Sequence, residues 1–103
     1  MIQLTPEQKK IVLEILQRHV PDRPVFAFGS RVKGRTKPFS DLDLAIMGDA
    51  PLPLNIEGDL REDFSASDLP FRVDLVDWAT TSDEFRQVIK RDGEIFYQPP
   101  VGS

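Results

Sequence analysis

The sequence contains no cysteine and only one histidine, His19, among its 103 residues. The absence of cysteine excludes disulfides and thiolate metal sites. His19 falls near the end of a predicted helix, where the helix dipole mildly favours a protonated imidazole. We therefore interpret His19 as a capping or surface residue rather than as a catalytic base.

The sequence also lacks a long apolar run that could span a membrane, and its first residues show no signal-peptide pattern. Acidic residues outnumber basic ones by 17 to 13, which gives a net charge of −4. This balance argues against general binding to a nucleic-acid backbone, which requires Lys and Arg to neutralise phosphates. We expect a cytoplasmic protein that binds neither membranes nor nucleic acid directly.

The length and composition predict one globular domain. Hydrophobic residues make up 40% of the chain and charged residues 29%, which is usual for soluble domains. A chain of 103 residues can bury a modest core. We predict a single domain over residues 1–98 and a disordered tail over residues 99–103.

Predicted helices and strands alternate along the chain. Helical spacing of apolar residues, with capping signals at Thr5 and Thr81, predicts the helices, which cover residues 6–20, 31–35, 52–64 and the segment that follows Thr81. Short apolar runs predict the strands, which cover residues 25–28, 41–47 and 71–76, with residues 94–97 as a candidate edge strand. This alternation indicates an α/β fold in which the strands carry a site on one face and helices cover the other face.

The most informative stretch runs from Gly29 to Asp43. A pair of small residues, Gly29 and Ser30, closes an apolar run, and ten residues separate it from Asp41 and Asp43. Such a pair lets the backbone approach a phosphate closely and offers it N–H donors and a hydroxyl. On a strand, Asp41 and Asp43 would point to the same face, where their charges repel unless a cation lies between them. Mg²⁺ is the usual cation, because it binds carboxylates together with substrate phosphates.

Four basic residues lie within the same stretch, namely Arg31, Lys33, Arg35 and Lys37. In an acidic protein such a cluster indicates one focused anionic ligand, and a solvated loop is the plain alternative. Arg31, Lys33 and Arg35 are candidates to neutralise a triphosphate, and the sequence does not rank them.

A third carboxylate, Asp74, lies on the predicted strand over residues 71–76. It could join Asp41 and Asp43 at one metal site, or it could pair with Arg72, which lies two residues away on the same face of the strand. Asp77 is three residues from Asp74, so we predict that it faces the other side or lies beyond the strand in a structural role.

The motif residues also have ordinary structural explanations. Gly29 and Ser30 could form a simple turn, and Asp43 could pair with Arg31 or Lys33. Each explanation is plausible alone, but all of them holding together at this spacing is less expected than one metal site.

The combination of Gly29-Ser30, ten residues and Asp41-x-Asp43 resembles the signature of nucleotidyltransferases with the DNA polymerase β fold. Residues 29–34, 40–45 and 71–78 are similar to the minimal nucleotidyltransferases (the MNT family) of prokaryotes, and the resemblance extends from the first helix to about Tyr97. It implies a central mixed sheet of three main strands plus a possible edge strand, flanked by helices.

The resemblance also implies the chemistry. Asp41, Asp43 and Asp74 would be the catalytic carboxylates and would bind two Mg²⁺ ions about 3.5–4 Å apart. Gly29 and Ser30 would bind the β- and γ-phosphates of the nucleotide, with Arg31 and Lys33 as further nucleotide-binding residues.

Relatives of this kind pair with small all-helical HEPN proteins encoded alongside them. In such toxin–antitoxin pairs the nucleotidyltransferase transfers AMP from ATP to a tyrosine hydroxyl of the HEPN toxin. The resemblance therefore implies ATP as substrate, a HEPN partner and an antitoxin role.

Two alternatives remain at this point. The chain could be a binding subunit with weak or no catalysis that neutralises a helical partner by contact, or it could modify a small molecule. The intact set of three carboxylates argues against the first alternative. The absence of a second domain in the short chain argues against the other.

Overall fold

The computed structural model describes residues 3–33 and 40–100, and only the backbone of Ser30 and Lys33. The predictions made for Arg35, Lys37 and the last three residues of the tail lie outside these ranges. Within them, every helix is too short or too polar to cross a lipid bilayer.

The centre of the fold is a sheet of four strands in the order β3-β2-β1-β4. The strands are β1 (Val25–Phe28), β2 (Leu42–Ile46), β3 (Val73–Asp77) and β4 (Glu94–Tyr97). β1 runs antiparallel to both β2 and β4, whereas β2 and β3 are parallel. The predicted mixed sheet is therefore confirmed, and the candidate edge strand, β4, does form one edge.

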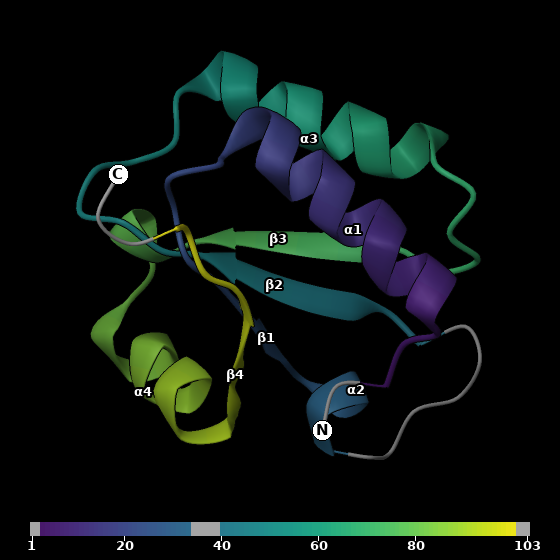
Figure 1. Ribbon diagram of the computed structural model, residues 1–103. Helices are drawn as coiled ribbons and strands as arrows, with labels where there is room; N and C mark the ends of the chain where they lie inside the picture. The colour runs from purple at the N-terminus through teal and green to yellow at the C-terminus, as the bar shows by residue number, and fades with distance from the viewer. Residues whose placement is uncertain (1–2, 34–39, 101–103) are drawn as a thin grey trace.

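Two long helices, α1 (Pro6–His19) and α3 (Leu54–Ala66), lie side by side over one face of this sheet (Figure 1). The apolar stripe of α1 and the inward side chains of the strands form the main core; its fully buried members include Val12, Leu16, Leu42, Leu44 and Leu60. Burial of each such side chain stabilises the fold by about 1.5–3 kcal/mol.

A polar contact joins the two long helices at one end. The His19 Nε2 atom lies 2.5 Å from Oδ2 of Asp63, and Arg18 Nη1 donates a 3.1 Å hydrogen bond to the same oxygen. The pKa of the Asp63 carboxyl is lowered, chiefly by the hydrogen bond with His19. His19 is therefore a contact between α1 and α3 and lies away from the predicted site.

The opposite face of the sheet is covered only in part. A short turn of helix at Trp78–Thr80 follows β3, and α4 (Asp83–Asp92) then packs Ile89 against Phe28 and Ala45 on this face. Figure 1 shows α4 on the side of the sheet away from α1 and α3. The prediction that the helices cover only the face opposite the site is therefore wrong, because α4 shares the face that carries Asp43 and Asp74.

Asp77 organises the junction after β3. Its carboxylate accepts hydrogen bonds from the backbone N–H of Leu52 at 2.9 Å and of Ala79 at 3.2 Å. Its backbone carbonyl accepts a hydrogen bond from the Thr81 hydroxyl at 2.7 Å. These contacts tie the segment before α3 to the end of β3 and confirm the predicted structural role.

We expect Asp77→Ala to lower the free energy of unfolding by about 1–3 kcal/mol, because two backbone N–H groups lose their acceptor. Urea denaturation of the purified protein would measure the change. Asp59→Ala, at an exposed position on α3, is the matched control and is expected to shift stability by less than about 0.5 kcal/mol. Equal stability of the two variants would contradict the structural role of Asp77.

Candidate active site

The turn that follows β1 brings the backbone against a carboxylate. Gly29 has φ of +82°, a conformation that side chains with a Cβ atom rarely adopt. A Cβ atom added here would overlap Oδ2 of Asp43. Both the left-handed backbone and the close approach therefore require glycine. The short helix α2 (Ser30–Lys33) begins at the next residue and directly follows this close approach to Asp43.

The carboxylates come together through strand pairing. In the parallel pairing of β2 with β3, Asp43 lies opposite Asp74, and in the antiparallel pairing with β1 it lies opposite Phe28. Asp41 lies just before β2 rather than on it. Paired positions in a sheet project side chains to the same face, so Asp43 and Asp74 share a surface.

This crowding changes the protonation of Asp43. Its pKa is raised from the ordinary value of 3.8 to about 6, first by burial and then by the negative charges of Asp74 and Asp41. A carboxylate in this position is a candidate cation ligand, because a bound cation would offset both the lost hydration and the repulsion.

The donor chemistry fits Mg²⁺, which prefers carboxylate oxygens at an open site that leaves room for water and substrate phosphates. Among the described residues, no three acidic or histidine side chains are already gathered closely enough to enclose an ion. Arg72 Nη2 lies 3.7 Å from Oδ1 of Asp74. Asp41, Asp43 and Asp74 are therefore the candidate metal ligands.

The pair between Arg72 and Asp74 is a weak competitor for that role. The distance of 3.7 Å exceeds hydrogen-bonding range, and the Arg72 side chain is 82% exposed. Exposed ion pairs of this kind contribute about 0–1 kcal/mol. The pair does not account for the proximity of Asp74 to Asp43.

Arg31 lies in a different environment from the one that its place in the motif suggested. The residue is only 4% exposed. Its Nε donates to the Ser40 carbonyl at 2.9 Å, and Nη1 donates to the Gln3 carbonyl at 2.7 Å. The guanidinium carbon lies 4.0 Å from the centre of the Phe71 ring. Arg31 thus connects the segment before α1, the residue before Asp41 and the segment before β3.

The structure brings Gly29, Asp41, Asp43 and Asp74 together, whereas Arg31 is directed into the protein. For Ser30 and Lys33, only the backbone position on α2 is described. No sequence pattern predicts the contact between Phe71 and Arg31, because the two residues are far apart in the chain and the aromatic ring fits a core position equally well.

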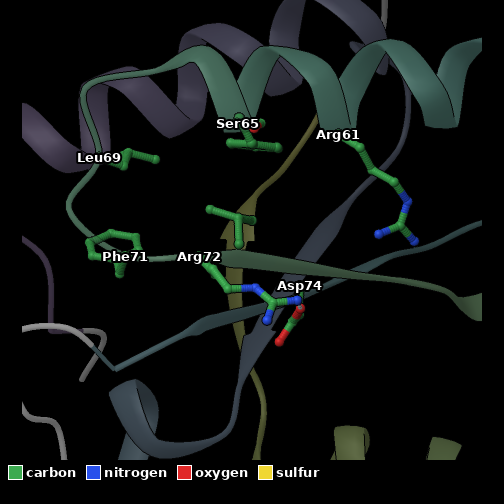
Figure 2. Close-up of a pocket in the computed structure, with 8 residues that line it drawn as sticks. Arg61, Ser65, Leu69, Phe71, Arg72 and Asp74 are labelled. Atoms are coloured by element: carbon green, nitrogen blue, oxygen red, sulfur yellow. Dashed lines mark ion pairs between the residues drawn. The ribbon is translucent and has the colours of Figure 1, made fainter.

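A cavity of about 280 Å³ adjoins Asp74 at the outer edge of β3 (Figure 2). It lies between β3 and the C-terminal half of α3. Figure 2 shows Arg61 extending from α3 toward the strand and the guanidinium of Arg72 next to the Asp74 carboxylate. No motif in the sequence marked this cavity, because its walls come from separate elements.

The fold and the arrangement of a Gly-Ser turn beside three carboxylates define a nucleotidyltransferase of the DNA polymerase β type. Residues 9–100 match the family described as "Polymerase beta, Nucleotidyltransferase", and the chain belongs to that family. It is 54% identical to the "Probable protein adenylyltransferase MntA" of Haemophilus influenzae over 90 residues. This aligned region covers 87% of this chain and 79% of that protein.

Solved structures with this fold include toxin–antitoxin complexes. One with AMP-PNP contains a chain with a TM-score of 0.73 and 25% identity, over 87% of this chain and 73% of that chain. A complex of tri-AMPylated HEPN toxin and MNT antitoxin from Shewanella oneidensis gives a TM-score of 0.66 at 23% identity, over 87% of this chain and 69% of that chain. At 23% identity, the similarity to the Shewanella oneidensis antitoxin chain shows a shared fold.

We expect Asp43→Asn to stabilise the metal-free protein above pH 6. The raised pKa means that the folded state binds more protons than the unfolded state between about pH 4 and pH 6, so stability falls as the pH rises through this range. The asparagine variant escapes this loss. The gain at pH 7.5 should be on the order of 1–3 kcal/mol, since the site is partly open to solvent.

Denaturant unfolding in EDTA at pH 4 and pH 7.5 would test this expectation. The advantage of Asp43→Asn should shrink at pH 4, where the unfolded carboxylate also begins to protonate. An equal effect at both pH values would show that crowding of charge at Asp43 is not its cause.

Arg31→Met should destabilise the free protein by about 1–3 kcal/mol, because the carbonyls of Ser40 and Gln3 lose a charged donor. Thermal unfolding without nucleotide or metal would show the loss. Arg91→Met, on the exposed surface of α4, serves as the control. A guanidinium that served only to bind nucleotide would leave the free protein's stability unchanged, and that result would contradict the role seen here.

Proposed function

We propose that this chain is a Mg²⁺-dependent adenylyltransferase that transfers AMP from ATP to a tyrosine hydroxyl of a HEPN toxin and thereby acts as its antitoxin. The observation that carries the proposal is the placement of Asp43 between Gly29 and Asp74. Support comes from the relative named as a protein adenylyltransferase and from the toxin–antitoxin structure with AMP-PNP.

In this proposal the turn at Gly29 and Ser30 holds the β- and γ-phosphates, because its backbone lies against the carboxylates and leads into α2. Lys33 lies on the same short helix and is a further candidate to contact the triphosphate. Arg31 would act indirectly, by holding the segment that carries Asp41.

The acceptor oxygen forms a bond to the α-phosphorus of ATP, and the bond from this phosphorus to the bridging oxygen of pyrophosphate breaks. Asp74 accepts the proton of the acceptor hydroxyl, while Asp41 and Asp43 would hold the Mg²⁺ that the triphosphate carries. Bound Mg²⁺ would supply charge stabilisation and lower the pKa of the attacking hydroxyl. Catalysis of this kind rests mainly on positioning and electrostatics.

The test is intact-mass spectrometry of the HEPN protein encoded beside this chain, after incubation with the chain, ATP and Mg²⁺. We expect a mass gain in whole AMP units that is lost with EDTA. Asp43→Asn should reduce the rate by at least about 100-fold, as expected for removal of a group that stabilises the transition state. Asp59→Asn is the matched control.

Peptide mapping would then show whether the AMP lies on a tyrosine. A stable complex without any mass gain would overturn the proposed catalysis and favour neutralisation by contact. Full neutralisation by a variant with both Asp41→Asn and Asp43→Asn would lead to the same conclusion. Neither a complex nor a mass gain would exclude this HEPN protein as the acceptor.

A further inference from the structure

The exposed aromatic ring of Phe85 lies close to the carboxylate site. Phe28, at the end of β1, is the strand partner of Asp43, and such partners have Cβ atoms about 4.5–5.5 Å apart on one face of a sheet. The ring of Phe85, in the first turn of α4, packs on Phe28 with 5.6 Å between the ring centroids. Two contacts of similar length therefore lead from Asp43 through Phe28 to Phe85.

The ring of Phe85 keeps a surface that can bind a ligand. Phe85 is 38% exposed, whereas Phe28 is 7% exposed. The two ring planes meet at 80°, an edge-to-face arrangement in which Phe28 covers at most one face of Phe85. In the part of the chain that the structure describes, the other large apolar side chains that are exposed are those of Leu54 and Ile95, and neither is aromatic. Phe85 is therefore the exposed ring on which a flat group can stack.

The surroundings of Phe85 favour a neutral ligand. Asp83 and Glu84 precede it in the first turn of α4, and both are exposed. The guanidinium of the next residue, Arg86, is directed to the Trp78 carbonyl, to which Nε donates at 3.0 Å and Nη2 at 2.7 Å. Two carboxylates in this turn repel phosphate oxygens. A flat and uncharged group fits this surface better than a phosphate does.

The order of the strands restricts where the nucleoside of ATP can lie. In phosphoryl transfer the attacking and leaving oxygens lie roughly in line with the phosphorus. With the phosphates at the Gly29 turn after β1 and the acceptor hydroxyl at Asp74 on β3, this line runs across the strands. The ribose is bonded to the same phosphorus at an angle to the line. The nucleoside therefore extends along the strands or away from the sheet.

The helix α4 covers the sheet in the direction in which β2 runs from Asp43. Ala45 is the next residue after Asp43 on the same face of β2, and it packs against Ile89 of α4. Figure 1 shows α4 on this side of the sheet, away from α1 and α3. A nucleoside that extends along the strands from Asp43 thus meets α4, where Phe85 offers an exposed aromatic surface.

We propose that Phe85 stacks on the adenine of ATP, and that Phe28 and Phe85 together form the base subsite of this nucleotidyltransferase. This inference rests on the proposed function. The turn at Gly29 holds the phosphates, the α-phosphate lies at the carboxylates, and the base lies against α4. Stacking on an aromatic ring accepts every base, because each base has a π face. Phe85 thus contributes affinity for the nucleotide rather than preference for adenine.

Two probes separate binding of the base from binding of the phosphates. AMP-PNP with Mg²⁺ carries both groups, whereas tripolyphosphate with Mg²⁺ carries no base. Phe85→Ala should weaken binding of AMP-PNP by about tenfold, which is within the range for loss of one stacked base. It should leave binding of tripolyphosphate as in the wild type. Isothermal titration calorimetry of the full chain measures both dissociation constants.

Two further variants and a kinetic assay complete the test. Phe85→Tyr keeps the ring and should bind AMP-PNP with nearly wild-type affinity. Leu54→Ala is the matched control, because Leu54 is 85% exposed on α3, over the opposite face of the sheet. In transfer assays Phe85→Ala should raise the KM for ATP by about tenfold and leave the KM for the HEPN partner unchanged. Thermal unfolding of each variant confirms that it is folded.

The outcomes separate this inference from the proposed function. If the wild-type chain does not bind AMP-PNP with Mg²⁺, both are overturned. If it binds and Phe85→Ala binds equally well, only the inference is wrong. Equal weakening of both probes would show that Phe85 supports the carboxylate site rather than the base, and an increased KM for the HEPN partner alone would place the acceptor at Phe85. Either of these two results also overturns the inference.

Discussion

The parallel pairing of β2 with β3 is the constraint on which this site depends. It fixes Asp43 opposite Asp74, and together with the nearby Asp41 it concentrates negative charge on one face of the sheet. Such crowding opposes folding, since one carboxylate is held with a raised pKa. The opposite face offsets this cost, because Leu42 and Leu44 of β2 are fully buried beneath α1 and α3. A tightly packed core thus holds repelling carboxylates on one partly exposed face of the sheet.

Arg31 shows that a position in a motif does not fix a role. A basic residue one step after Gly-Ser fits a phosphate ligand by sequence, yet its guanidinium is buried and satisfied by the carbonyls of Ser40 and Gln3. The planar guanidinium can bond two carbonyls and also stack on Phe71, which a lysine cannot reproduce. The basic residue of the motif nearest to Gly29 therefore supports the segments around the site from inside the protein.

The elements of the site follow one another across the sheet in the order of the strands β1, β2 and β3. A turn suited to phosphates follows β1, carboxylates lie on or beside β2 and on β3, and a cavity with a cationic rim lies at the outer edge of β3. The other edge strand, β4, and the helix α4 enclose the opposite part of the same face.

The sequence by itself determined the α/β class, the positions of the strands to within one or two residues, and the candidate carboxylates, since these follow from local apolar patterns and from the spacing of Gly29, Asp41 and Asp43. It also predicted a structural role for Asp77. Only the tertiary structure decided that α4 shares the face of the site, that Arg31 is directed inward, and that Arg61 reaches the Leu75 carbonyl of β3. These outcomes depend on contacts between residues that are distant in sequence. Strand order and helix packing set the geometry of these contacts, and local sequence patterns do not encode it.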